Sequence, residues 1–255
     1  MITSPDATAV QLSVVIPVCN ESENVAELAR EIHAALHGLC TFEVLFVDDG
    51  STDTTVAAVL QVRSQSVPQI RLLKHSVRSG QSAAVRTGVR AARAPWIATL
   101  DGDGQNDPAD IPKLLAALRD DQQRSDSGQV PLKLIMGNRT TRRDTWLRRL
   151  SSLIANGVRG SMLNDGTPDT GCGIKLFDRE LFMELPHFNH MHRFLPALVQ
   201  RSGMRVISVP VAHRARMRGT SKYGLHNRLW VGIVDLFGVM WLIKRRIARQ
   251  QITEE

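Results

Sequence analysis

The sequence predicts an α/β fold with a mostly parallel central sheet flanked by helices. Short apolar runs rich in valine, isoleucine and leucine alternate with segments of helical periodicity. Two of these runs end abruptly in carboxylates, at Asp48-Asp49 and at Asp101-Gly102-Asp103. Ligands of open α/β sheets lie beyond the carboxyl ends of the strands, so both acidic pairs are expected at one ligand-binding edge.

The first strand–helix unit shows the pattern that the rest of the chain repeats. The apolar run 12–18 predicts a buried strand, and Val25, Leu28, Ile32 and Leu36 then recur at helical spacing. The polar stretch 120–131 is expected to be a surface loop. The same reasoning predicts further strands at 42–47, 70–74, 96–100, 133–137 and 204–211, and further helices at 55–63, 80–92, 107–118 and 148–162.

The C-terminal segment differs from the rest, and we place a boundary between a domain at 1–224 and a helix with its tail at 225–255. The run 229–243 carries one charge, Asp235, and is followed by three basic residues. It is shorter than the roughly 20 apolar residues that a membrane span needs. Trp230 and Trp241 suit a membrane interface. We therefore expect an amphipathic interfacial helix, with a buried or oligomer-packing helix and a true span as alternatives.

Composition limits the classes of partner. The 255 residues suffice for one large domain, and the formal net charge of +7 favours an anionic partner. Aromatic residues make up 5% with a single tyrosine, which is a poor supply of stacking platforms for nucleic acid. Three scattered cysteines and an N-terminus without a signal-peptide pattern indicate the cytoplasmic side of a membrane. A homo-oligomer is compatible with the sequence.

The Asp101-Gly102-Asp103 motif allows several interpretations. A calcium loop of the EF-hand type is excluded, because Asn106 and Pro112 stand where glycine and glutamate are needed. A phosphatase of the haloacid dehalogenase type is disfavoured, because the motif is mid-chain and continues with Gln105. A solvated turn and a metal site for a nucleotide sugar remain. The second acidic strand end at Asp48-Asp49 favours the metal site.

Three ordered motifs together resemble the family 2 glycosyltransferases. They are 15–21 (VIPVCNE), 47–53 (VDDGSTD) and 101–105 (DGDGQ), and the similarity runs from about residue 12 to 243. The resemblance is greatest to the branch that contains dolichol-phosphate mannose synthase and bacterial polyprenyl-phosphate glycosyltransferases. It implies a GT-A type nucleotide-binding fold and a divalent metal, Mg²⁺ or Mn²⁺.

The resemblance also implies residue roles on the donor side. Asp101 and Asp103 match the metal-binding Asp-x-Asp, and Gln105 matches a glutamine of the metal shell. Asp49 matches the aspartate that contacts the base, and Cys19 stands where the family usually has a tyrosine-like residue. The donor-binding positions implied in this way are Pro17, Cys19, Glu21, Asp48, Asp49, Asp101, Gly102, Asp103, Arg139, Arg216 and Lys222.

On the acceptor side, the resemblance places Arg139, Arg148 and Ser152 around a lipid phosphate. Arg148 and Ser152 are one helical turn apart, which puts them on one face of the expected helix. Arg216 and Lys222, in a segment ending Gly-Thr-Ser-Lys-Tyr, would contact the donor diphosphate from a lid. The catalytic set implied is Asp101, Asp103, Arg139, Arg148, Ser152 and Arg216.

The implied reaction is inverting transfer of a hexosyl group from a nucleotide sugar to a polyprenyl phosphate on the cytoplasmic face of a membrane. Mannose from GDP-mannose is favoured, and UDP-sugars remain open. A phosphate acceptor is already ionised near neutrality, so a dedicated base is unnecessary. A family 2 transferase with another acceptor would need a base, and Asp169 is the candidate. A non-catalytic nucleotide-binding or membrane-scaffolding protein is the alternative from a different class.

A histidine cluster invites comparison with a metal site. His187, His190 and His192 lie close in sequence, but their spacing fits no standard ligand motif. We expect an ordinary loop at this position.

Overall fold

The computed structural model describes residues 9–124, 128–139, 163, 166–214 and 225–246. Four of the expected site residues, Arg148, Ser152, Arg216 and Lys222, lie outside these ranges, as does the helix expected at 148–162. Their roles remain predictions.

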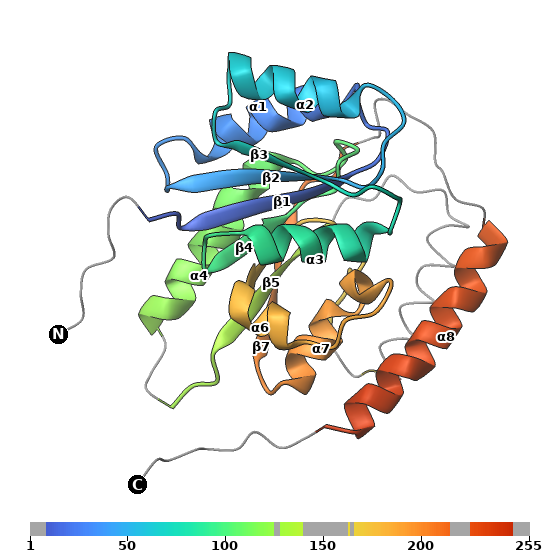
Figure 1. Cartoon of the computed structure of the whole chain (residues 1–255). Helices are drawn as coiled ribbons and strands as arrows, with labels where there is room; N and C mark the ends of the chain where they lie inside the picture. Colours follow the sequence, from blue (N-terminus) through green and yellow to red (C-terminus); the bar gives the residue numbers. More distant parts are fainter. Residues whose placement is uncertain (1–8, 125–127, 140–162, 164–165, 215–224, 247–255) are drawn as a thin grey trace, which may run out of the picture.

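A seven-stranded sheet forms the centre of the molecule, with the strand order β3-β2-β1-β4-β6-β5-β7 (Figure 1). All neighbours pair in parallel except β6, which is antiparallel to both β4 and β5. The expected mostly parallel sheet is therefore confirmed. The strands are β1 (Leu12–Val18), β2 (Phe42–Asp48), β3 (Ile70–Lys74), β4 (Trp96–Thr99), β5 (Leu132–Arg139), β6 (Lys175–Asp178) and β7 (Arg205–Val211).

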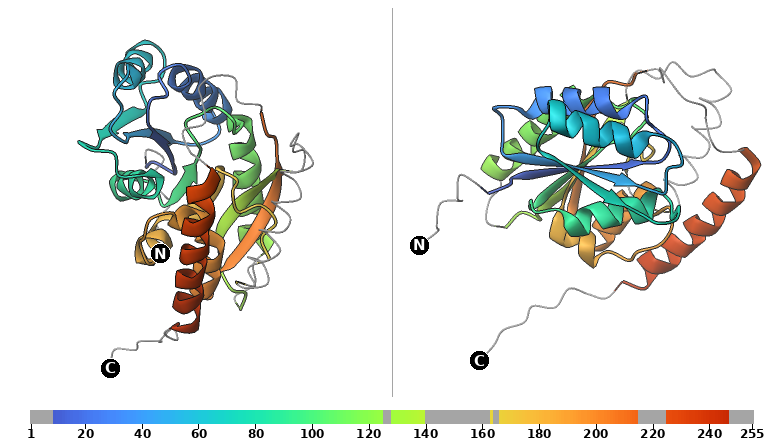
Figure 2. Two further views of the ribbon diagram at one scale, coloured as in Figure 1. Left: turned by 90° about the vertical axis from the view of Figure 1, so that its right-hand side faces the viewer. Right: turned by 45° about the horizontal axis from the view of Figure 1, so that its top comes forward.

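Helices cover both faces of the sheet and enclose a separate apolar core on each side (Figures 1 and 2). The helices α1, α2 and α4 contribute to one core, and α3, α6, α7 and α8 contribute to the other. The bounds are α1 (Val25–Leu36), α2 (Thr55–Gln65), α3 (Gln81–Ala91), α4 (Ile111–Arg124), α6 (Arg179–Glu184), α7 (Leu195–Arg201) and α8 (Leu225–Lys244), with short 3-10 turns at Pro108–Asp110 and Met191–Arg193.

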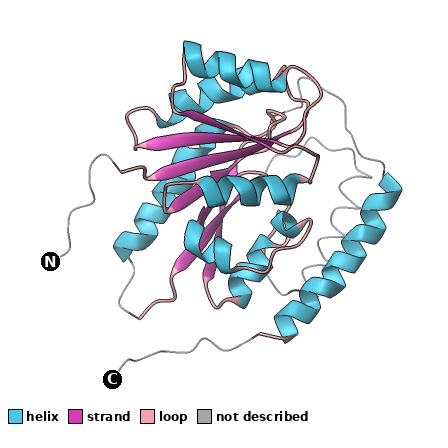
Figure 3. Ribbon diagram, viewed as in Figure 1, coloured by secondary structure: helices cyan, strands magenta, loops and turns pink. Residues whose placement is uncertain are grey.

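Four described elements differ from the sequence prediction, and the short helices α6 and α7 are two that were not expected. The helix α4 continues to Arg124, beyond the expected end at residue 118, because Arg119, Gln122 and Gln123 are good helix formers that tolerate solvent. The strand β6 was not expected, since its four residues include a lysine and show no alternation of apolar and polar residues. Figure 3 shows the strands gathered at the centre of the domain, with helices around them.

The helix α8 lies along one side of the domain and packs against α7 (Figure 1). Val239 is fully buried in this contact. The opposite side exposes an apolar stripe, in which Val234, Phe237 and Trp241 are 60 to 68% exposed. The expected C-terminal helix is therefore present, and its place at a membrane interface remains a prediction. Among the described residues, no helix has the length and apolar character that crossing a membrane requires.

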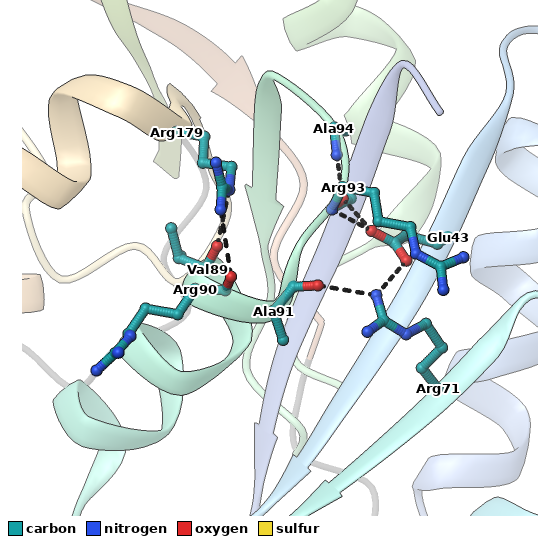
Figure 4. A network of polar contacts seen from close by, with 9 residues as sticks. Glu43, Arg71, Val89, Arg90, Ala91, Arg93, Ala94 and Arg179 are labelled. Atoms are coloured by element: carbon teal, nitrogen blue, oxygen red, sulfur yellow. Dashed lines mark hydrogen bonds and ion pairs between the residues drawn. The ribbon is translucent and has the colours of Figure 1, made fainter. Parts of the chain in front are cut away.

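The amino edge of the sheet is held by a network of hydrogen bonds around a buried carboxylate (Figure 4). Glu43, at the start of β2, is 4% exposed. Its carboxylate accepts hydrogen bonds from the Ser13 hydroxyl at 2.7 Å, from Arg71 Nη1 at 2.7 Å and from the Arg93 N–H at 2.7 Å. Arg71 also donates to the Ala91 carbonyl at the end of α3. One carboxylate thus ties three strands to a helix terminus.

Candidate functional site

The opposite, carboxyl edge brings the two predicted acidic pairs to the same side of the sheet. The strand β2 ends at Asp48, and two residues beyond the end of β4 lies Asp101. Because β1 lies between β2 and β4 and pairs in parallel with both, the two strand ends are neighbours across one strand. The placement expected from the sequence is confirmed for the described residues.

A glycine allows the chain to pass directly beneath Asp101. A Cβ atom at Gly173 would lie 2.3 Å from Asp101 Oδ2 and 2.4 Å from Asn106 Oδ1. Asn106 is buried, and its Oδ1 accepts a hydrogen bond from the Asp101 N–H at 3.1 Å. The loop after β4 is therefore folded tightly around the Asp101 carboxylate, and a side chain at position 173 would require Asp101 and Asn106 to move.

The Asp-x-Asp pair has the character of a divalent-metal site. Burial raises the pKa of Asp101, and the neighbouring charge of Asp103 raises it further. A divalent cation between the carboxylates would relieve this repulsion. Gln81 Nε2 donates to Asp101 Oδ1 at 2.8 Å and fixes its orientation. Within the described residues, no cluster of three His, Cys, Asp or Glu side chains could hold a metal alone. Two carboxylates nevertheless fit Mg²⁺, which is often bound with substrate phosphates and water.

A cavity of about 400 Å³ opens next to Asp101. Polar side chains line its walls, including Gln81, Asp101, Gln105 and Arg139. Phe177, Phe182 and Leu195 supply apolar surface. Its size lies within the range of small-molecule sites, which is about 300 to 1,000 Å³. The cavity can therefore accept a group attached to a ligand held at the Asp-x-Asp pair.

Asp49 has a defined structural role at this edge. Its carboxylate accepts hydrogen bonds from the Ser79 and Gly80 N–H groups at 2.8 Å each, and contacts His75 Nδ1 at 2.8 Å. Burial opposes its charge, but these hydrogen bonds outweigh burial and hold the pKa of Asp49 below its usual value. Gly50 lets this loop approach, since a Cβ there would lie 2.9 Å from the Arg78 nitrogen. Asp49 thus positions the loop before α3, and base contact by Asp49 remains a prediction.

The other positions expected to line the nucleoside pocket lie in two interlocked loops. Asn20, with φ of 54°, donates its N–H to Ser51 Oγ at 2.9 Å, and its Oδ1 accepts from the Thr52 N–H at 2.8 Å. Cys19 and Glu21 flank it, and the Glu21 N–H donates to Thr55 Oγ1 at 2.8 Å. Ser51 and Thr52 of the 47–53 motif, together with Thr55, therefore join the loops after β1 and β2.

Asp48, which was also expected to bind the sugar donor, is 1% exposed. Its Oδ2 accepts a hydrogen bond from the Ser51 N–H at 3.3 Å. Its second oxygen, Oδ1, is buried without a hydrogen-bond partner in the described structure. Pro17 lies on the wall of the cavity. A Cβ atom at Gly102 would lie 2.7 Å from Val18 and 3.0 Å from the Pro17 carbonyl, so this glycine lets the loop after β4 lie against β1.

The guanidinium of Arg139 forms a two-point pair with Asp169. Nε lies 2.6 Å from Oδ2, and Nη2 lies 2.8 Å from Oδ1. Asp169 is 5% exposed, so the pair is largely removed from water. Arg139 lines the cavity while Asp169 holds its orientation. The roles expected for Arg139 at the donor and at a lipid phosphate remain predictions.

Arg214 anchors the chain just before the segment 215–224, in which the lid residues are expected. Its Nη1 donates to Glu31 of α1 at 2.7 Å, and its Nη2 lies 2.8 Å from Asp107 Oδ1. His213 pairs with Asn106 in an isolated bridge, and the Arg214 N–H donates to the Gln105 carbonyl. The chain thus enters the expected lid directly beside the Asp-x-Asp loop.

Several polar residues of the cavity wall were not expected from the sequence, among them Lys175, Ser82 and His192. Lys175 is 5% exposed. Ser82 Oγ lies 2.8 Å from His192 Nδ1. Burial lowers the pKa of His192 to about 3, and the charges of Lys175 and Arg193 contribute. The imidazole is therefore neutral near pH 7. A lysine interrupting the apolar run 174–177 was the available signal for Lys175.

The three histidines that lie close in sequence contact different parts of the described structure. His190 Nδ1 pairs with Asp235 Oδ2 of α8 at 3.0 Å, and His187 Nδ1 contacts the Met191 sulfur at 3.4 Å. The three side chains have separate partners. The expectation of an ordinary loop is consistent with these contacts.

Comparison with known proteins gives relatives over most of the chain. The family model "Glycosyl transferase family 2" matches residues 13–186. The dodecaprenyl-phosphate galacturonate synthase of Rhizobium johnstonii is 33% identical over 246 residues, covering 95% of this chain and 70% of the relative. An undecaprenyl-phosphate 4-deoxy-4-formamido-L-arabinose transferase of an Enterobacter species is 32% identical over 214 residues, covering 84% of this chain and 62% of the relative. The chain therefore spans about two thirds of the length of these relatives.

Solved structures confirm the GT-A type fold. Glucosyl-3-phosphoglycerate synthase from Mycobacterium tuberculosis, in complex with phosphoglyceric acid, aligns with a TM-score of 0.67 at 18% identity, covering 92% of this chain and 80% of that one. The same enzyme in complex with Mn²⁺, UDP and glucosyl-3-phosphoglycerate aligns with a TM-score of 0.64 at 17% identity and the same coverage. The matching family model and the extent of the first relative establish that this chain belongs to glycosyl transferase family 2.

Proposed function

We propose that this chain transfers a sugar from a nucleoside diphosphate sugar to a polyprenyl phosphate, with inversion at the anomeric carbon. The observation that carries the proposal is the Asp101/Asp103 pair beside a cavity at the carboxyl edge of the sheet. The named activities of the two curated relatives, both of which use a polyprenyl phosphate, support the choice of acceptor.

Asp101 and Asp103 would hold a divalent metal, Mg²⁺ or Mn²⁺, with Gln105 as the third protein ligand. The metal would neutralise charge on the donor diphosphate as that group leaves. Gln81 orients one metal-binding carboxylate through its hydrogen bond to Asp101. Arg216 and Lys222 would contact the diphosphate from the segment that follows Arg214.

The donor sugar we propose is a modified one in place of mannose. The relatives are named for galacturonate and for 4-deoxy-4-formamido-L-arabinose. We place uridine ahead of guanosine as the nucleoside, since solved structures of this fold were determined with UDP. At 17% identity this likeness concerns the fold, so both nucleosides enter the test.

The acceptor phosphate can attack without a protein base. A phosphate monoester is largely ionised at pH 7, since its second pKa is near 6. Asp169, the candidate base for an alcohol acceptor, accepts two hydrogen bonds from Arg139. This pairing favours the carboxylate as an ion-pair partner and supports a phosphate acceptor over an alcohol. Arg139, Arg148 and Ser152 would surround the lipid phosphate and offset its approach to the donor diphosphate.

Mass analysis of the lipid product tests the proposal. The protein is incubated with Mn²⁺, undecaprenyl phosphate and a panel of UDP- and GDP-linked sugars, including GDP-mannose. We expect a lipid whose own phosphate carries one added sugar, and release of the nucleoside diphosphate. Binding of donor and of anionic vesicles without any transfer would indicate the non-catalytic alternative. Transfer to a sugar or peptide acceptor alone would indicate the other family 2 activity.

The role proposed for Arg148 can be tested by comparing it with its neighbour. Arg148→Ala should raise the KM for polyprenyl phosphate at least about 10-fold, with little change in the KM for the donor, because a charge-assisted phosphate contact is lost. Arg149→Ala is the matched control and should leave both values nearly unchanged. A larger effect in Arg149→Ala would move the phosphate contact by one residue.

The C-terminal segment 225–255 completes the proposal as a unit that attaches the domain to a membrane surface. Its described helix exposes Val234, Phe237 and Trp241, and three basic residues follow. Apolar side chains next to basic ones bind the interface of anionic bilayers. We therefore propose peripheral association with the cytoplasmic face of the membrane, where the lipid acceptor resides.

A further inference from the structure

The cavity beside Asp101 contains a buried ammonium group with spare hydrogen-bonding capacity. Lys175 is 5% exposed, and its Nζ donates to the Cys172 carbonyl. An ammonium group carries three N–H donors. No other acceptor in the described structure takes a hydrogen bond from Nζ, so two donors remain for a ligand in the cavity.

The carboxylates nearest Lys175 have other partners, and a second cation, Arg193, also lines the cavity. Arg139 and Asp169 form their own two-point pair. Asp101 and Asp103 form the proposed metal site, so a divalent cation would offset both carboxylates. Burial lowers the pKa of Lys175, whereas nearby carboxylates raise it, so a ligand carboxylate in the cavity would favour its charged form. An uncompensated buried charge is costly, and a methionine would fit apolar neighbours such as Phe177 and Leu195 better.

The position of Lys175 in the sheet places this charge where the transferred sugar would lie. Lys175 begins β6 and pairs with Thr99 in the antiparallel register with β4. Asp101 follows Thr99 by two residues, so the lysine is beside the strand end that would hold the diphosphate. A sugar joined to that diphosphate would enter the cavity of about 400 Å³ that both residues line. Ser82 and neutral His192 offer uncharged polar groups for its hydroxyls.

We propose that Lys175 selects donors whose sugar carries a carboxylate, namely nucleotide-linked uronic acids, by pairing with that carboxylate in the cavity. The inference rests on the proposed function and names the sugar class and the residue that recognises it. Between the sugars named for the two relatives, galacturonate carries such a carboxylate and the formamido-arabinose does not. A lysine forms a charge-assisted pair with a carboxylate, whereas it forms a weaker hydrogen bond with an uncharged formamide.

The test is isothermal titration calorimetry in the presence of Mn²⁺, which gives the Kd values of UDP-galacturonate and UDP-galactose. At C6 the first has a carboxylate and the second has a hydroxymethyl group. The wild-type protein should bind UDP-galacturonate at least about 10-fold more tightly. Lys175→Met should weaken the binding of UDP-galacturonate about 10- to 100-fold, since one charge-assisted contact is lost. The affinity for UDP-galactose should change less than about 3-fold. Lys175→Arg should retain most of the preference. Lys133→Met, which removes a lysine paired with Asp178 at the amino edge, is the matched control and should keep the wild-type preference.

Equal binding of both donors by the wild-type protein, or binding of neither, would overturn the inference even if Lys175→Met failed to fold. Equal losses for both donors in a folded Lys175→Met protein would also overturn it, because they would assign the lysine to the diphosphate. The lipid-product assay separates the two proposals. Uronate preference without any lipid product would contradict the proposed function alone, and efficient transfer of neutral sugars without preference would contradict the inference alone.

Discussion

Two buried carboxylates, one at each edge of the sheet, have opposite surroundings. At the amino edge, Glu43 is enclosed by donors from Ser13, Arg71 and Arg93. At the carboxyl edge, Asp101 faces a second carboxylate, Asp103, and its pKa is raised by burial and by that charge. A satisfied carboxylate stabilises the fold, whereas a pair of opposed carboxylates is stabilised by a ligand.

Two lysines show a similar contrast. Lys133 pairs with Asp178 at 2.5 Å at the amino edge, where Arg205 also pairs with Asp121 at 2.7 Å. At the carboxyl edge, Arg139 is paired with Asp169, but Lys175 donates to a backbone carbonyl. A buried lysine without a carboxylate partner among the described residues indicates where a ligand binds.

The largest expected effect comes from removing a metal-site carboxylate. Asp103→Ala should lower turnover at least about 1,000-fold and leave the melting temperature nearly unchanged, because the lost group repels Asp101 and supports the metal. Initial rates of lipid glycosylation and thermal melts measure the two effects. Asp121→Asn, at the amino edge, is the control and should retain turnover. Near-normal turnover in Asp103→Ala would remove the metal assignment.

A substitution of Glu43 at the amino edge should have the opposite outcome, with stability reduced and activity retained. Glu43→Gln should lower the free energy of unfolding by about 2 to 4 kcal/mol, because Arg71 loses its buried partner and one acceptor becomes a donor. The rate per folded molecule should remain close to wild type. Urea titration gives the stability, and rates measured well below the transition give the activity. Unchanged stability would show that this network does not hold the sheet.

Gly173→Ala tests the close approach at the carboxyl edge. The added Cβ would lie 2.3 Å from Asp101 Oδ2, so the carboxylate or the strand must move. We expect Mn²⁺ affinity, measured by titration in the presence of UDP, to fall about 10-fold, with a loss of stability of about 1 to 3 kcal/mol. Gly128→Ala, where a Cβ meets nothing within 4 Å, should change neither. Wild-type affinity in Gly173→Ala would contradict the described packing.

The smallest expected effect is the pH dependence of stability that His192 adds. Its folded pKa is about 3, below its unfolded value near 6.5. Between these values the unfolded chain binds the extra proton, so stability falls as pH falls, by at most about 1.4 kcal/mol per pH unit from this group. Urea titrations at pH 5.0 and 6.5 should show a smaller difference for His192→Gln than for wild type. An equal difference in both proteins would show that His192 titrates normally.

Much of the fold could be predicted from the sequence because its strands are continuous apolar runs and its helices are amphipathic. The elements through β4 agree closely with prediction, as β1 and β2 show. The strand β6 was missed because four residues carry too little periodicity. The end of α4 was missed because polar helix formers also occur in loops.

The acidic half of the site could be predicted because strand-end carboxylates lie close in sequence to their strands. Lys175 and His192 could not, since only tertiary pairing brings β6 and the 191–193 turn to Asp101. The pairing of Arg139 with Asp169 joins residues 30 apart, which no local pattern indicates. The contacts of Asp49 with Ser79 and Gly80 likewise required the structure.

Metal-dependent formation of a lipid-linked sugar is the most direct test of the assignment of the carboxyl edge. Purified protein, undecaprenyl phosphate and UDP-galacturonate are incubated with Mn²⁺, with EDTA, and with EDTA followed by excess Mn²⁺, and the lipid is analysed by mass. We expect the glycosylated lipid with Mn²⁺, its loss with EDTA and its return when Mn²⁺ is restored. Lipid product formed equally in EDTA, or release of free sugar without any lipid product, would contradict the account.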